Sequence, residues 1–268
     1  MSREFAGHVA RKRFGQNFLR EPHVIAQIVR LIAPRPGQVL VEIGPGQGAL
    51  TWPLLAAAGT LTAIELDRDL AVGLRAVSER RQLQLNLIEA DALSVDLTAL
   101  AAQHGQRLRM VGNFPYNISS PLLFHLLDHL PALLDIHCML QKEVVERMAA
   151  APGGKEFGRL SVMVQARCSV TSVLDVPATA FQPVPKVESA IARLEPLPQQ
   201  PRPDELAALD RIIRAAFAQR RKTLSNALRG VVTSTQMDVA GISPGQRAEQ
   251  VDVASWLRLA GVLLQAEG

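Results

Sequence analysis

The four-residue segment Asn113-Phe114-Pro115-Tyr116 carries groups suited to holding a planar base that bears an amino group. The lone pair of such an amine is delocalised into the ring, so the nitrogen is a weak nucleophile until it is pulled out of plane. The Asn113 side-chain oxygen and the Phe114 carbonyl are acceptors that could hold the two N–H groups. Tyr116, the one tyrosine in the chain, could stack on the base, while Pro115 keeps the turn rigid. The same residues would also suit an ordinary turn after a strand.

A glycine-rich loop precedes this segment. Gly44-x-Gly46-x-x-Ala49 satisfies the pattern of a dinucleotide-binding loop, and Glu65 lies where an acid that binds ribose hydroxyls is expected. The pattern suits NAD or any other cofactor that contains adenosine. Pro45 and Gly48 favour a loop wrapped around an amino-acid tail, and Asp91 could accept a hydrogen bond from an adenine amine. Because no acid or base for hydride transfer follows, we favour S-adenosylmethionine over NAD.

These candidate residues follow successive apolar runs. Strands are expected at residues 39–43, 61–64, 83–88 and 109–112, and the polar positions that close them, Gly44, Glu65, Asp91 and Asn113, are 21, 26 and 22 residues apart. Each interval suits one strand and one crossover helix, so the pattern predicts a parallel α/β sheet. The carboxyl ends of parallel strands form the ligand-binding edge, where the four residues should converge. Further strands are expected at residues 136–140, 170–176 and 189–194.

Helices are expected between and after these strands. The spacing of apolar residues predicts a helix that starts at Pro22 and ends near Pro34, and further helices over residues 49–58 and 142–150. Ser120 and Pro121 suit the N-cap and first turn of another helix. Prolines at 196, 198, 201 and 203 mark the best domain boundary. We therefore expect a catalytic domain over residues 1–200 and a small all-α domain over residues 201–268, with helices at 204–217 and 252–264.

Two basic segments suggest a polyanionic partner. Residues 11–20 contain four basic residues, including Arg11, Lys12 and Arg13, with no acid and two phenylalanines. This segment is either a solvated arm or an arm that touches nucleic acid and covers the site. A second cluster, with Arg220, Arg221 and Lys222, lies in the small domain, where polyanion binding is the favoured interpretation.

Composition limits the remaining possibilities. Lys and Arg exceed Asp and Glu by 29 − 25 = 4, which permits a polyanionic partner without requiring one. Cys138 and Cys168 lie in apolar segments and are expected to be buried thiols of a reducing compartment. No apolar run is long enough to span a membrane, so we expect a cytoplasmic protein. His125 and His129 lie four residues apart, but without a third ligand we expect no metal site.

Taken together, these motifs resemble those of the ribosomal RNA adenine N6,N6-dimethyltransferases, specifically the bacterial branch that acts on 16S rRNA. The similar segments are residues 11–19, 41–50, 64–70, 113–119, 140–145, 158–162, 181–190 and 219–223. The resemblance implies a Rossmann-like, S-adenosylmethionine-dependent fold with a mostly parallel seven-stranded sheet. It also implies dimethylation of two adjacent adenines in the 3′-terminal hairpin of 16S rRNA, within the small ribosomal subunit or its precursor, by an enzyme expected to be a monomer.

The resemblance also implies roles for individual residues. The cofactor contacts would be Asn17, Leu19, Gly44, Gly46, Glu65, Asp91 and Asn113. The target adenine would lie against Asn113, Phe114, Pro115 and Tyr116, and the RNA against both basic segments. The family commonly has leucine at the position of Phe114, a departure that could change the shape of the pocket. The alternatives are a methyltransferase of DNA or large-subunit rRNA adenines, an assembly factor that has lost methyl transfer and, last, an NAD-dependent oxidoreductase.

Overall fold

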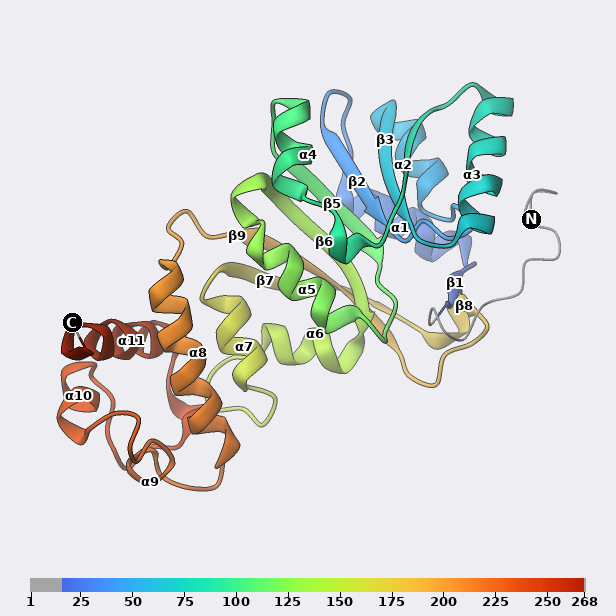
Figure 1. Ribbon diagram of the computed structural model, residues 1–268. Helices are drawn as coiled ribbons and strands as arrows, with labels where there is room; N and C mark the ends of the chain where they lie inside the picture. The colour runs from blue at the N-terminus through green and yellow to red at the C-terminus, as the bar shows by residue number, and fades with distance from the viewer. Residues whose placement is uncertain (1–15, 268) are drawn as a thin grey trace. The chain divides into compact units, whose positions relative to one another are not determined.

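The computed structural model describes residues 16–267, which contain a seven-stranded sheet. The strand order is β4-β3-β2-β5-β6-β9-β7 (Figure 1). Pairing is parallel between β4 and β3, β3 and β2, β2 and β5, and β5 and β6, whereas β6 and β9 are antiparallel. The predicted α/β fold with a mostly parallel sheet is therefore confirmed. The strands are β2 (Val39–Ile43), β3 (Thr60–Glu65), β4 (Gln84–Glu89), β5 (Leu108–Asn113), β6 (Leu133–Gln141), β7 (Cys168–Val176) and β9 (Ser189–Pro196).

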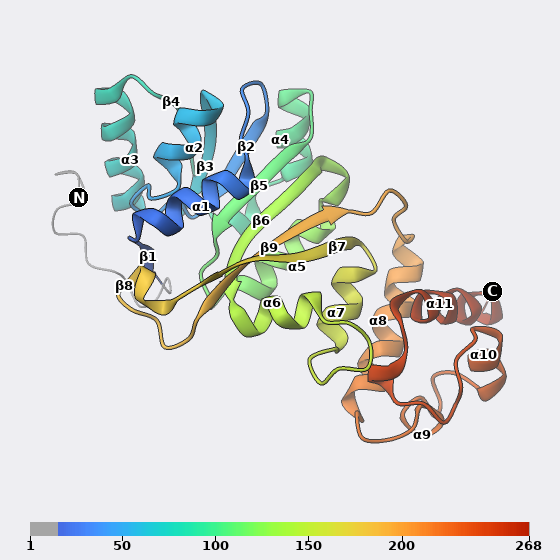
Figure 2. The same cartoon turned by 180° about the vertical axis from the view of Figure 1, so that it is seen from behind.

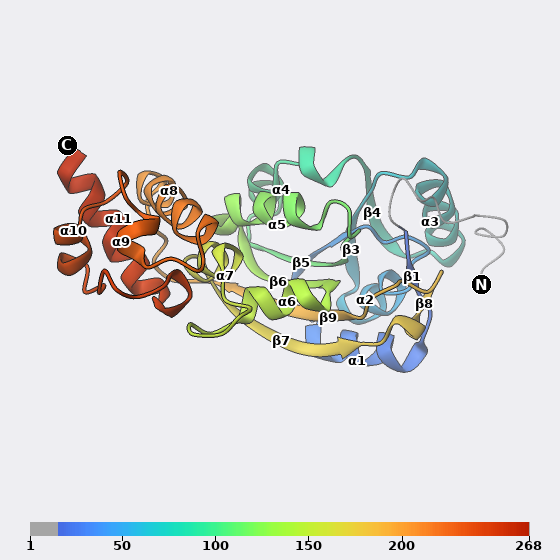
Figure 3. The same cartoon turned by 90° about the horizontal axis from the view of Figure 1, so that it is seen from below.

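Helices cover both faces of the sheet. Figure 1 shows α4 (Leu97–His104) and α5 (Ser119–Asp128) in front of the strands. In Figure 2, the view from behind, α1 (Pro22–Ile32) lies in front of the strands and so covers the opposite face. Seen from below in Figure 3, α1 and α4 lie on opposite sides of the sheet. The remaining helices of these crossovers are α2 (Thr51–Ala58) and α3 (Arg68–Arg81).

The start of α5 differs from the prediction. The helix begins at Ser119 with Ile118 as its N-cap, so the assignment of Ser120 as the N-cap is wrong. The Ser119 hydroxyl instead donates a hydrogen bond to the Tyr116 carbonyl at 3.1 Å. The turn that carries Tyr116 is thereby joined directly to the first residue of the helix.

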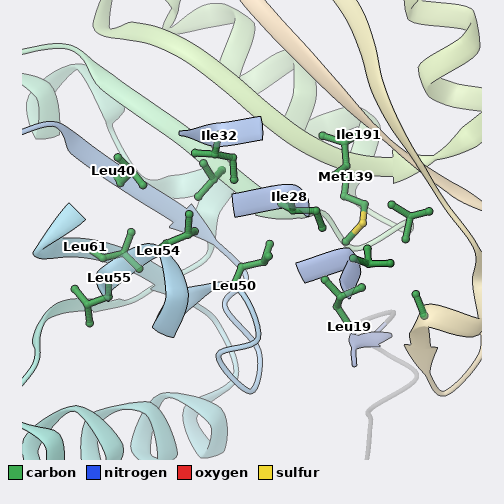
Figure 4. Packing of buried hydrophobic residues seen from close by; sticks show 14 of the residues in the cluster. Leu19, Ile28, Ile32, Leu40, Leu50, Leu54, Leu55, Leu61, Met139 and Ile191 are labelled. Carbon is green, nitrogen blue, oxygen red and sulfur yellow. The ribbon is translucent and has the colours of Figure 1, made fainter. Parts of the chain in front are cut away.

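The main hydrophobic core lies between α1, α2 and the sheet. Ile28 and Ile32 of α1 pack with Leu54 and Leu55 of α2 against Leu40 of β2 (Figure 4). Each of these side chains is at most 2% exposed. Their apolar spacing on each helix explains the orientation, since only one face of α1 carries buried residues. This packing holds the sheet edge at which the candidate residues lie.

A small second sheet was not predicted. The two-residue strands β1 (Phe18–Leu19) and β8 (Phe181–Gln182) pair in antiparallel fashion. The Arg20 amide extends this pairing by donating to the Ala180 carbonyl at 2.8 Å. The last residues of the basic N-terminal segment are therefore fixed against residues 180–182.

A charged pair is buried within the sheet. Arg109 of β5 and Asp135 of β6 are linked by a 2.8 Å ion pair, and Arg109 also donates to the Ile32 carbonyl at 2.7 Å. Burial of a charge is tolerated when it is paired and hydrogen-bonded, as here. The pair joins the C-terminal end of α1 to two central strands.

The chain divides into two compact units. The first contains the residues up to Val145 together with Thr171–Pro196, and the second contains Glu146–Val170 and the residues from Leu197 onward. The boundary at Pro196 lies close to the proline-rich segment that sequence analysis marks. The segment Glu146–Val170, however, belongs with the C-terminal helices, whereas the sequence-based division places it in the catalytic domain.

The second unit has its own helical core. Phe157, Phe217 and Trp256 form a chain of aromatic contacts, with ring centroids 6.4 and 6.2 Å apart. Trp256 and Phe157 are completely buried. The helices of this unit are the C-terminal half of α6 (Lys142–Ala149), α7 (Arg159–Gln165), α8 (Pro203–Ala218), α9 (Leu224–Ala227), α10 (Ser234–Val239) and α11 (Val253–Glu267).

Candidate active site

One cavity of about 610 Å³ lies at the carboxyl ends of strands β2 to β5. All described candidates for cofactor binding and catalysis line it. They are Asn17, Leu19, Gly44, Gly46, Glu65, Asp91, Asn113, Phe114, Pro115 and Tyr116. Sheet topology explains the convergence, because four neighbouring parallel strands end at this edge.

The glycine loop has a backbone that requires glycine. Gly46 and Gly48 have φ values of +58° and +83°, a region that residues with a Cβ atom rarely adopt. A Cβ atom on Gly48 would lie 2.3 Å from the Trp52 indole nitrogen, so the indole occupies the space that a side chain would need. At Gly46 a Cβ atom would lie 3.2 Å from the ring of Phe18. At these two glycines the wall of the cavity is therefore formed by main-chain atoms without side chains.

The Glu65 carboxylate is fixed by the backbone of this loop and of the next turn. It accepts hydrogen bonds from the amides of Gly46 at 3.1 Å and Asp67 at 2.9 Å. Burial raises the pKa of Glu65, and these two hydrogen bonds oppose the increase. Because each oxygen accepts one backbone bond, lone pairs remain for ligand hydroxyls. The carboxylate is thus held in one orientation at the end of β3.

Asp91 has a local structural role as well as a place in the cavity. Its side chain caps the short 3-10 helix Ala92–Ser94 by accepting from the Leu93 amide at 3.0 Å. The cap fixes the carboxylate at the end of β4 and leaves its second oxygen for another donor. The strand-closing position of Asp91 is visible in the sequence, whereas its capping role is seen only in the structure.

Asn113 is oriented by the N-terminal segment. Its side-chain nitrogen donates to the Asn17 carbonyl at 3.0 Å, so the oxygen is the amide atom available to accept a hydrogen bond in the cavity. The next residue, Phe114, is 1% exposed, and its amide donates to the Met139 carbonyl at 3.1 Å. The turn after β5 is therefore anchored to β6 and to the segment around β1.

Tyr116 is held at its phenolic end. Its hydroxyl lies 2.6 Å from the hydroxyl of Ser189, the first residue of β9. Burial raises the pKa of Tyr116, and the Ser189 hydrogen bond opposes that effect. The phenol therefore stays neutral at physiological pH, when it can donate or accept this bond.

Glu42 was not among the predicted site residues. It lines the cavity from within β2, is 2% exposed, and has a carboxylate oxygen without a hydrogen-bond partner among the described residues. Burial raises the pKa of Glu42 to about 8; Thr51 opposes the increase and Glu65 adds to it. Glu42 could have been identified from the sequence, because it is an acid within the otherwise apolar run 39–43.

The candidates for RNA binding lie elsewhere. Arg220, Arg221 and Lys222 follow the C-terminal end of α8 in the second unit. Arg220 already has partners, since it donates to the Gly154 carbonyl at 3.2 Å and lies 3.7 Å from the Glu249 carboxylate. The other candidates, Arg11, Lys12 and Arg13, lie outside the described residues.

The histidines of α5 make protein contacts. The Nε2 atom of His125 lies 3.0 Å from the Val95 carbonyl, and Nδ1 of His129 lies 2.9 Å from the His125 carbonyl. Across residues 16–267, no group of three or more His, Cys, Asp or Glu side chains is arranged to hold a metal. Both cysteines are buried and free, as predicted. None of the helices described is long and apolar enough to cross a membrane.

The glycine loop at the end of β2, the acids after β3 and β4, and the mostly parallel seven-stranded sheet define an S-adenosylmethionine-dependent methyltransferase. The model of the family "Ribosomal RNA adenine dimethylase" matches residues 7–265. The chain belongs to this family, whose members are S-adenosylmethionine-dependent enzymes that dimethylate adenines of ribosomal RNA.

Individual relatives agree with this assignment. The chain is 53% identical over 256 residues to the ribosomal RNA small subunit methyltransferase A of Xanthomonas euvesicatoria, covering 95% of this chain and 97% of the relative. It is 49% identical over 266 residues to the enzyme of the same name from Pseudomonas aeruginosa, covering 99% and 98%.

Two solved structures share the fold over most of their length. A dimethyladenosine transferase from Plasmodium falciparum is similar with a TM-score of 0.77 and 26% identity, covering 90% of this chain and 95% of the other. The 23S rRNA methyltransferase ErmE has a TM-score of 0.73 and 27% identity, covering 93% and 100%.

Proposed function

We propose that this protein transfers methyl groups from S-adenosylmethionine to the N6 atoms of two adjacent adenines in the 3′-terminal hairpin of 16S rRNA. The observation that carries the proposal is the Asn113 side chain, whose nitrogen is occupied by Asn17 and whose oxygen remains as an acceptor in the cavity. The high identity to small-subunit methyltransferases over 95% or more of the chain supports the choice of RNA. The reaction would take place during biogenesis of the small ribosomal subunit.

The cavity suits the proposed cofactor. Gly44 and Gly46 would let backbone approach the amino-acid tail, Glu65 would bind the ribose hydroxyls, and Asp91 would accept from the adenine amine. Asn17 and Leu19 of the N-terminal segment and Asn113 at the end of β5 would complete the contacts. When bound, S-adenosylmethionine supplies an electrophilic methyl group on a sulfonium.

The Asn113-Phe114-Pro115-Tyr116 turn would hold the target adenine. The Asn113 oxygen and the Phe114 carbonyl would accept the two N–H groups of the amine and increase its nucleophilicity. Tyr116 would stack on the base, and Pro115 would limit the motion of the turn. With S-adenosylmethionine bound, the amine nitrogen held by this turn would gain the methyl carbon as the carbon–sulfur bond breaks, and the resulting ammonium would lose its proton to water. No general base is required before the transfer, because the ammonium is acidic.

Access to the target requires an unstacked base. Unpaired bases of an RNA loop are displaced at little cost, so a hairpin loop suits this pocket better than a duplex. Phosphate contacts would come from Arg221, Lys222 and Arg220 of the second unit and from the basic N-terminal segment. Because Arg220 has intramolecular partners, we expect Arg221 and Lys222 to contribute most. We further propose that the enzyme acts as a cytoplasmic monomer on the small subunit or its precursor.

The experiment is a methyl-transfer assay on small ribosomal subunits from cells that lack this modification, followed by mass analysis of the digested RNA. We expect N6,N6-dimethyladenosine with the wild-type protein. Asn113→Ala should lower the rate by roughly 10² to 10³-fold, as loss of one preorganised polar contact does in other enzymes. Asn86→Ala is the matched control, because Asn86 lies in β4 and its amide bonds to Thr62 outside the cavity.

The same assay separates the alternatives. Methylation of large subunits or of DNA in place of small subunits would contradict the proposed substrate. An Asn113→Ala protein as active as wild type would contradict the assigned role of this amide. Binding to small subunits without any methyl transfer would indicate an assembly factor instead.

A further inference from the structure

The phenolic end of Tyr116 is attached to a residue far away in the sequence. Its hydroxyl and the Ser189 hydroxyl are 2.6 Å apart, and Ser189 is fully buried. The Tyr116 side chain itself is only partly buried and lines the cavity. One end of the ring is therefore fixed to the protein while the ring remains accessible to a ligand.

Ser189 is well placed to act as a rigid anchor. It is the first residue of β9 and pairs with Gln141 of β6, the strand that lies beside β9 in Figure 2. The preceding residue, Glu188, accepts a 3.0 Å hydrogen bond from the Lys142 amide at the start of α6. The backbone on each side of Ser189 is thus held by the central sheet.

The opposite end of Tyr116 is fixed separately. The Tyr116 carbonyl accepts from the Ser119 hydroxyl, and the Ile118 amide donates to the Pro115 carbonyl at 3.1 Å. With its backbone held by the turn and its hydroxyl held by β9, the ring loses freedom about both side-chain torsions. A stacking surface that is already oriented loses less conformational entropy when the base binds.

We infer that Ser189 is a positioning residue for methyl transfer, which fixes the plane of the Tyr116 ring against the target adenine through its hydroxyl. This inference rests on the proposed function, because it assigns Ser189 to the base-binding side of the same cavity. It also predicts an effect on the second methylation. The monomethylated amine is bulkier, so it must be held more accurately to present its nitrogen again.

The first test uses the fact that Tyr116 is the one tyrosine of the chain. Protein labelled with 3-fluorotyrosine should give a ¹⁹F NMR signal that reports on this ring alone. Ser189→Ala should shift the signal and change its width. The control is Ser78→Ala, since Ser78 is also buried and its hydroxyl donates to the Leu83 carbonyl at 2.9 Å, outside the cavity. An unchanged signal in Ser189→Ala would overturn the inference.

The second test measures methyl transfer to unmodified small subunits. Ser189→Ala should lower kcat by about tenfold, with KM for S-adenosylmethionine unchanged, because misorientation of a reacting group costs rate. The ratio of N6-monomethyladenosine to N6,N6-dimethyladenosine should rise, whereas partial unfolding of the enzyme would lower both products together. Tyr116→Phe keeps the ring but removes the same hydrogen bond, so it should reproduce both effects. The double variant should be no worse than either single variant.

The outcomes are distinguishable. If the Ser189→Ala variant has the same kcat and the same product ratio as the wild type, the positioning role is overturned. The proposed function then still stands, provided that the wild type transfers methyl groups. If Ser189→Ala does not fold, Tyr116→Phe decides, and a fully active Tyr116→Phe overturns the inference. If wild-type protein transfers no methyl group but the ¹⁹F signal responds to Ser189→Ala, the proposed function fails and the anchoring of Tyr116 stands.

Discussion

Glu42 provides a quantitative prediction about pH and stability. The Glu42→Gln substitution keeps the size and shape of the side chain but removes its ability to ionise. Burial raises the pKa of Glu42 from 4.5 to about 8 in the folded protein. The folded state therefore binds this proton more tightly than the unfolded chain does. The stabilising contribution is complete below about pH 4.5 and is lost as the pH rises through about 8.

The magnitude follows from the two pKa values. One pKa unit corresponds to about 1.4 kcal/mol, so ionising Glu42 costs the folded state up to about 5 kcal/mol at high pH. Between pH 5 and pH 8, the free energy of unfolding of the wild type should fall by roughly 3 to 4 kcal/mol relative to Glu42→Gln. Any constant difference from burying an amide is independent of pH and does not affect this comparison.

The assay is urea unfolding at several pH values, in which unfolding is monitored by fluorescence and circular dichroism. Glu79→Gln serves as the control, because Glu79 is an exposed residue of α3 and does not line the cavity. We expect the curves of wild type and Glu42→Gln to diverge steadily above pH 5. Parallel curves would show that Glu42 has the same pKa in both states, which would refute the reasoning from burial.

Two further predictions test the loop and the basic cluster. Gly48→Ala should abolish cofactor binding measured by calorimetry, because the new Cβ would lie 2.3 Å from Trp52. The control is Gly37→Ala, which should bind the cofactor normally, because Gly37 also has a positive φ but a Cβ there would have nothing within 4 Å. Arg221→Ala should weaken binding to small subunits and reduce its dependence on salt. Arg220→Ala should in addition lower the melting temperature, since Arg220 bonds within the second unit. Equal melting temperatures for the two arginine variants would contradict that distinction.

The sequence predicts the sheet well because each strand is an apolar run closed by a polar residue. Val39–Ile43 is predicted with its observed bounds, and the residues that close β2 to β5 do converge on one cavity. The start of α5 was misplaced because the serine next to Ser120 bonds to the preceding turn instead. Local patterns therefore predict that such elements exist, but competition between neighbouring residues limits how accurately their first and last residues can be predicted.

Long-range contacts could not be predicted from local patterns. The strands β1 and β8 have two residues each and no apolar periodicity, so only their pairing in three dimensions reveals them. The hydrogen bond between the Tyr116 and Ser189 hydroxyls is likewise visible only in three dimensions, because the two residues are 73 positions apart. Glu42 was visible as an acid in an apolar run, but its raised pKa depends on burial by the folded chain.

The pairing of β1 with β8 also determines when the site can form during synthesis. The walls of the cavity come from residues 16–118, which leave the ribosome early. The partner of Phe18 and Leu19 is at residues 181–182, and the anchor of Tyr116 is residue 189. A nascent chain therefore has the glycine loop and the acids long before Phe18 and Leu19, which line the same cavity, are fixed. Assembly of the site is thus tied to nearly complete translation of the first unit.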